Sequence, residues 1–179
     1  MRSRLVILLS LFCSITSFAS CNGAKGKTGN HVIRPDSSVC HTLGKTMSEV
    51  LFSPSKVTCY TIIGKSAVDK DDFVLEPHYV RDSLVTKLNV SQINILQFNL
   101  LADEDNYKED TMKVRSPYVP YVEFCFEKKK MEKVHVVISL SDFSWTIIFD
   151  GKIQGNWNYA DKRLMDRLCR MILGETYKK

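Results

Sequence analysis

The chain has 179 residues, of which 44% are hydrophobic and 25% charged, and its formal net charge is +5 at pH 7. These proportions are ordinary for a globular protein that buries a real core. Basic residues are interspersed with acidic ones instead of gathering in one stretch, so the composition gives no support to nucleic-acid binding.

Residues 1–20 have the layout of a signal peptide. Two arginines form a charged head, and the apolar stretch Leu5–Phe12 that follows is shorter than the ~20 residues that a helical membrane span needs. Small residues then give a peptidase access to extended backbone. We therefore expect export, with cleavage either after Ala19 by an ordinary signal peptidase or directly before Cys21.

The segment Phe18-Ala19-Ser20-Cys21 resembles a bacterial lipobox, in which the cysteine thiol takes a diacylglycerol and becomes the first residue of the mature protein. Phe18 departs from the leucine that is usual there. The next nine residues, Asn22–Asn30, contain three glycines, two lysines and no large apolar side chain, which is typical of a flexible tether. The resemblance implies acylation of Cys21, with palmitate among the acyl groups, and the lipid membrane as a partner. The alternative is a plain secreted or periplasmic protein.

We divide the chain into a signal peptide (1–20), a flexible tether (21–36) and a single α+β domain (37–179). A lipobox, a glycine-rich tether and one small domain together resemble uncharacterised envelope lipoproteins of Gram-negative bacteria. The resemblance implies a location in the cell envelope, at the outer membrane. It identifies no domain family and transfers no active site.

The first half of the domain is expected to contain three helices and one strand. Helical spacing of apolar residues predicts a helix over 42–52, and a β-branched and aromatic run predicts a strand over 57–63 that stops at Gly64. Further helices are expected over His78–Leu88 and Val90–Leu101. In the second of these, alternation of apolar and polar residues also permits a strand, but the length of the run favours a helix.

The last third predicts three successive strands, Val119–Glu127, Val134–Leu140 and Trp145–Asp150, in which large apolar residues alternate onto one face. A final amphipathic helix, roughly Tyr159–Leu173, has a continuous apolar stripe that fits this face. The fold class is therefore α+β, an antiparallel β-meander of three to four strands packed against helices, including the C-terminal amphipathic helix.

Four cysteines remain after the signal peptide and Cys21 are set aside, and export implies an oxidising compartment. They allow three pairings, with free buried thiols as the alternative. The most local pair, Cys40 and Cys59, is the candidate disulfide. The full set is Cys40, Cys59, Cys125 and Cys169.

Two groups of residues have the types that nucleophilic catalysis uses. Cys40 and His41 are adjacent, but neighbouring side chains usually diverge. Alternation places Cys125, His135 and Glu123 on the face of the strands that points away from the aromatic core. A Cys-His-Glu group is a protease-like arrangement, and the alternative is an ordinary polar face.

The histidines are scattered without the spacing of metal ligands. The acidic residues after position 102 lack the glycine and the terminal glutamate of a calcium loop, so a solvated loop is expected; they are Asp103, Glu104, Asp105, Glu109 and Asp110. We assign no catalytic, metal or cofactor-binding residue.

Two functions from different classes follow. The first is a lipid-anchored, non-catalytic module that binds a protein, a peptide or a glycan, through an edge strand of the sheet or the basic side of the final helix. The second is a small secreted thiol-dependent hydrolase that uses a Cys/His pair. The scarcity of catalytic motifs favours the first.

Overall fold

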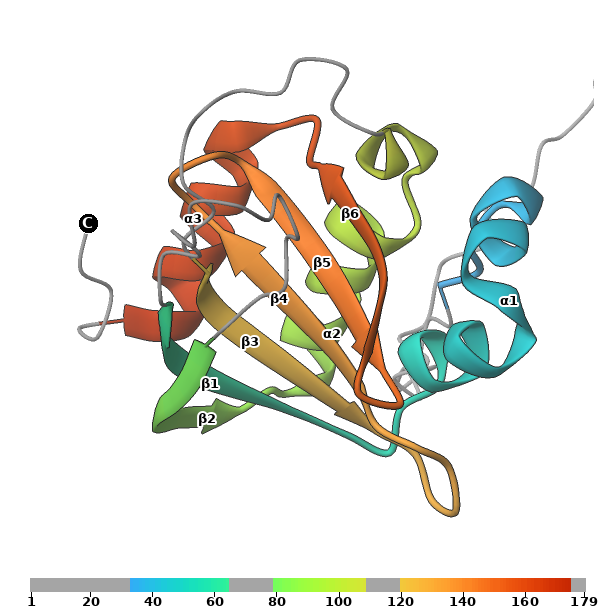
Figure 1. The fold of residues 1–179 in the computed structure, drawn as a ribbon, viewed down its shortest axis with the longest axis horizontal. Coiled ribbons are helices and arrows are strands. Elements are labelled where there is room, and N and C mark those ends of the chain that lie inside the picture. Colours follow the sequence, from blue (N-terminus) through green and yellow to red (C-terminus); the bar gives the residue numbers. More distant parts are fainter. Residues whose placement is uncertain (1–32, 65–78, 109–119, 175–179) are drawn as a thin grey trace, which may run out of the picture.

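A computed structural model describes residues 33–64, 79–108 and 120–174. In these ranges six antiparallel strands form one sheet in the order β2-β1-β3-β4-β5-β6 (Figure 1). The α+β class is confirmed, with six strands instead of the expected three to four. The strands are β1 (Lys56–Gly64), β2 (Tyr79–Lys87), β3 (Pro120–Glu127), β4 (Val134–Ser139), β5 (Ser144–Phe149) and β6 (Lys152–Asn158).

The helices pack on one face of this sheet and share its core (Figure 1). The long helix α1 has a kink at Gly44, whose φ of 69° is in the left-handed region that glycine tolerates. Helix α2 continues directly into a π-helical turn, η1, so the helix expected over Val90–Leu101 is confirmed. The helical elements are α1 (Ser37–Phe52), α2 (Val90–Leu96), η1 (Gln97–Leu101), the 3-10 turn η2 (Glu104–Tyr107) and α3 (Lys162–Leu173).

The central strands have the alternation that the sequence predicts. Phe124 and Phe126 on β3, Val136 on β4 and Trp145 on β5 are all fully buried against the helices. From α3, Met165 and its apolar neighbours reach the same core, as the amphipathic pattern of that helix indicates.

The prediction of a helix over His78–Leu88 is wrong, because residues 79–87 form the edge strand β2. Among the strands that the structure describes, β2 pairs with β1 alone, and the pairing contains two register shifts. Most of its side chains are exposed on both faces. An edge strand of this kind has no buried face to impose an alternating pattern, which explains the error.

Strand β6 was not expected at all. It follows Asp150 and Gly151, which form a two-residue turn in which both φ angles are positive, as a hairpin with strand-compatible twist requires. Within β6, Gly155 lies against the ring of Trp157 so closely that a Cβ there would be 2.0 Å from Cζ2. Gly155 makes the sequence look less like a strand, but the packing of the Trp157 ring requires a residue without a side chain at this position.

The signal peptide, Cys21 and most of the expected tether lie outside the described residues, as do Glu109 and Asp110. In the part of the chain that is described, no helix has both the length and the apolar character needed to cross a membrane.

Candidate functional site

The face of the sheet opposite the helices has a cluster of three chemically active side chains. Glu123 and Cys125 alternate with the core residues of β3, and His135 does so on β4. Cys125 and His135 are direct partners in the β3–β4 register. One donor atom from each of the three residues lies within 4.8 Å of the others. The structure therefore brings together the group that alternation predicted.

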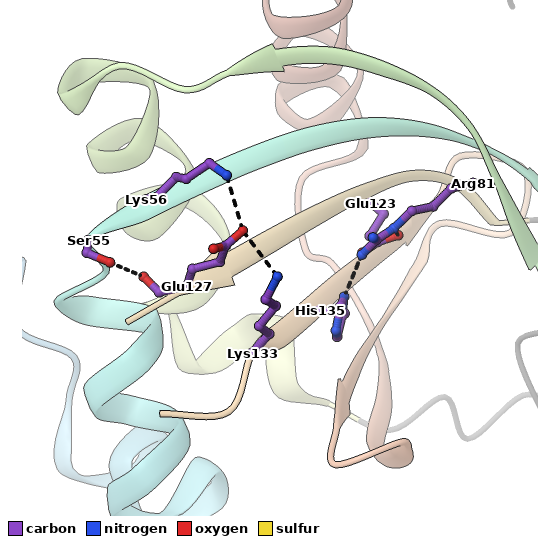
Figure 2. A network of polar contacts seen from close by, with 7 residues as sticks. All are labelled: Ser55, Lys56, Arg81, Glu123, Glu127, Lys133 and His135. Atoms are coloured by element: carbon purple, nitrogen blue, oxygen red, sulfur yellow. Dashed lines mark hydrogen bonds and ion pairs between the residues drawn. The ribbon is translucent and has the colours of Figure 1, made fainter. Parts of the chain in front are cut away.

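Arg81 completes this cluster from the edge strand β2, and sequence reasoning missed it (Figure 2). Its Nε donates to Oε2 of Glu123 at 2.8 Å, and its Nη2 donates to Oε1 at 2.5 Å. The guanidinium also lies over the ring of Tyr60 on β1, 4.4 Å from the ring centroid. A correct strand assignment for residues 79–87 was the signal needed to place Arg81 on this face.

Glu123 is the centre of the cluster and its carboxylate is completely buried. His135 Nδ1 lies 2.6 Å from Oε1 and donates to it. Burial by itself favours the neutral acid, but the hydrogen bonds from Arg81 and His135 outweigh it and lower the pKa of Glu123 below its ordinary value. The carboxylate is therefore ionised and holds two cationic partners.

His135 is charged at neutral pH in this environment. Hydrogen bonding to Cys125 and to Glu123 outweighs the opposing effect of burial and raises its pKa to about 9. The imidazolium, the guanidinium of Arg81 and the carboxylate of Glu123 form a compact group with one net positive charge. The thiol of Cys125 lies against this group.

Cys125 itself is almost completely buried, with 1% of its surface exposed. Its partner in the β1–β3 register is Thr58, which is also buried. The hydroxyl of Thr58 has no hydrogen-bond partner among the described residues. A row of Thr58, Cys125 and His135 thus crosses three strands, with an unsatisfied hydroxyl beside the thiol.

The other sequence candidates are not brought together. Cys40 and His41 are exposed on α1, whereas Cys59 is buried on the core face of β1. Cys40 and Cys59 are free thiols in the structure, so their bridge stays a prediction.

The acidic residues around η2 make local contacts. Asp103 caps the turn by accepting from the Asp105 backbone, Asp105 pairs with Lys108, and Glu104 accepts from Ser38. A surface hollow of about 380 Å³ lies between α1 and η2 and is lined by Ser38, Val39, Thr42, Glu104, Asp105, Tyr107 and Lys108. The contacts agree with a solvated surface turn.

No family model, no curated protein and no solved structure matches this chain. The chemistry of the cluster and the pattern of exposed surface are therefore the basis for a function.

Proposed function

We propose that this chain is an exported lipoprotein of the cell envelope, held at the outer membrane by a lipid on Cys21. The support is in the sequence: a charged head, a short apolar stretch, small residues before the cysteine and a glycine-rich segment after it. A lipid of this kind fixes the domain at a membrane surface and leaves it free to meet partners there.

We propose further that the domain is a non-catalytic module that binds an extended polypeptide along β2. The observation that carries this proposal is the apolar surface of a nine-residue edge strand. Val80 is 57% exposed and Leu84 is 65% exposed, and Ile63 of β1, the register partner of Val80, is exposed as well. An edge strand offers unpaired backbone groups to an added strand, and exposed apolar side chains give such an addition its contact surface.

The burial of Cys125 argues against catalysis by the cluster. A nucleophilic thiol must reach its substrate, and this sulfur is enclosed between neighbouring strands with 1% of the residue exposed. Glu123 and Arg81 are paired with each other. These contacts account for the group as a buried carboxylate that two partly exposed cations hold in place.

The anchor is tested by cell fractionation of two cysteine variants. Cys21→Ser removes the thiol that would carry the lipid, and we expect it to move the protein from the membrane fraction to the soluble fraction. Cys13→Ser is the matched control, because Cys13 leaves with the signal peptide and its loss should leave the protein with the membranes. A Cys21→Ser protein that stays membrane-bound would overturn the proposed anchor.

The binding surface is tested by site-specific photo-cross-linking in cells. A photoreactive residue at position 84 should form a discrete cross-linked product with another polypeptide, and a purified partner should then bind the wild-type domain but not Leu84→Lys. The same photoreactive residue at Met171, which is exposed on α3, is the control. Equal cross-linking at both positions, or none at position 84, would contradict strand addition at β2.

A thiol-dependent hydrolase remains the second candidate, because the structure brings Cys125, His135 and Glu123 within reach of one another. Such an enzyme requires a reactive thiol in the folded state. The test uses the Cys40→Ser variant, which lacks the exposed thiol. Rapid alkylation of Cys125 by iodoacetamide near neutral pH in this variant would favour the hydrolase. We expect Cys125 to react only after unfolding.

A further inference from the structure

We propose that Glu123, Cys125 and His135 form a binding site for a divalent transition metal of the zinc class. The three residues supply a carboxylate, a thiol and an imidazole, which is a donor set that suits a borderline-soft ion. Sequence spacing gave no sign of this site, since the donors are brought together by strand register and not by a short motif.

The geometry needs only small adjustments to hold one ion. Zinc binds sulfur at about 2.3 Å and nitrogen or oxygen at about 2.0–2.2 Å, so donors on one tetrahedral ion are roughly 3.4–3.7 Å apart. The donor atoms here lie within 4.8 Å of one another. Two of them are on residues that face each other directly across β3 and β4, and Glu123 is two positions along the same strand. Rotations of side chains can bring all three onto the ion without moving the sheet.

The charge balance also fits an ion at this buried position. A metal binds cysteine as the thiolate and histidine as the neutral imidazole, so binding releases protons to solvent. The thiolate of Cys125 and the carboxylate of Glu123 together offer the ion two negative charges. A divalent ion that is balanced in this way avoids the large desolvation cost of an unpaired buried charge.

Arg81 and Thr58 provide outer contacts to such a site. Arg81 binds Oε2 of Glu123 through Nε and shares Oε1 with His135 through Nη2, which also lies 3.2 Å from His135 Nδ1. Because 43% of its side chain is exposed, Arg81 can withdraw Nη2 toward solvent while the Nε bond orients the carboxylate. Thr58 lies opposite Cys125, and its buried hydroxyl has no partner in the described part of the chain. A cysteine thiolate would accept a hydrogen bond from this hydroxyl.

Three protein donors leave the fourth position of a tetrahedral ion open to water or to another small ligand. This arrangement differs from a closed structural site, which has four protein ligands. A metal site here adds a function to the binding module, and it does not require a polypeptide to bind along β2.

The test uses the purified mature domain without a histidine tag, stripped with a chelator and titrated with Zn²⁺ and with Co²⁺. We expect one equivalent of Zn²⁺ to bind by calorimetry and to raise the unfolding temperature. Co²⁺ should give the intense near-ultraviolet absorption of a cobalt–cysteinate bond. Cys125→Ser should abolish that band, and His135→Gln should lower the affinity at least about tenfold.

The matched controls are Cys40→Ser and His41→Gln, which change the same residue types on the exposed surface of α1. Both should leave the cobalt spectrum and the affinity unchanged. Because the folded wild-type protein is itself tested, the result does not depend on the stability of the variants. Absence of the cobalt–cysteinate band in the wild type, or its persistence in Cys125→Ser, would overturn the proposal.

Discussion

Arg81 on the edge strand β2 holds Glu123 on β3 by two hydrogen bonds, although β1 lies between the two strands. The guanidinium crosses β1 above the ring of Tyr60 to reach the carboxylate. The edge strand is therefore fastened to the middle of the sheet by a side chain as well as by its backbone. The same contact neutralises a carboxylate that is removed from water.

Glu123→Gln should destabilise the protein by about 3 kcal/mol, because it leaves two cations without their buried counter-charge. Glu127→Gln on the same strand is the control. Glu127 is partly exposed and pairs with Lys56 and Lys133, so its loss should cost within about 1 kcal/mol (Figure 2). Urea unfolding measures both free energies. Equal costs for the two variants would contradict the role given to Arg81 and His135.

His135 should make the stability of the metal-free protein fall in mildly alkaline solution. Its pKa is about 9 in the folded state and 6.5 ordinarily, so the folded protein holds the proton more tightly. The resulting stability is complete below about pH 6.5 and is lost as the pH rises through about 9. The charged groups that face this imidazole are Glu123 and Arg81, and the titratable Cys125 thiol lies beside it.

The measurement compares the free energy of unfolding of the wild type and His135→Gln at several pH values between these limits. The advantage of the wild type should shrink as the pH rises, because glutamine does not titrate. A difference between the two proteins that stays constant across this interval would show that the imidazole of His135 does not carry the charge assigned to it.

Gly155→Ala should destabilise the protein by about 3 kcal/mol, since the added methyl group collides with the ring of Trp157 in the core. Gly151→Ala in the same hairpin meets no neighbouring atom but has a φ of 67°, and strain alone should cost about 1 kcal/mol. Thermal unfolding of both variants checks the order. A milder effect at position 155 would mean that the tight packing on Trp157 is absent.

The sequence predicts elements correctly where burial imposes a period. Strands β3, β4 and β5 were found because Phe124, Val136 and Trp145 alternate with residues of the opposite face, and the same alternation placed Cys125 and His135 together. The helix α3 followed from its apolar stripe. In each of these elements one face is buried, so the spacing of the apolar residues indicates whether the element is a strand or a helix.

The edge strands could not be predicted in this way. In β2 most side chains are exposed, and in β6 the first three are, so no apolar period marks either strand. Arg81 was missed for this reason, and with it the neutralisation of Glu123. The residue types at Asp150 and Gly151 indicate the turn. The strand beyond it contains Gly155, whose role depends on how the Trp157 ring folds back over it, and the sequence does not show that orientation.

The proposed lipid on Cys21 can be read from the intact mass of the protein extracted from membranes. We expect the mass of a chain that begins at Cys21 with a diacylglycerol and an acyl chain attached. A mass that corresponds to a chain beginning at Ser20 without lipid would contradict it and would leave a soluble exported protein.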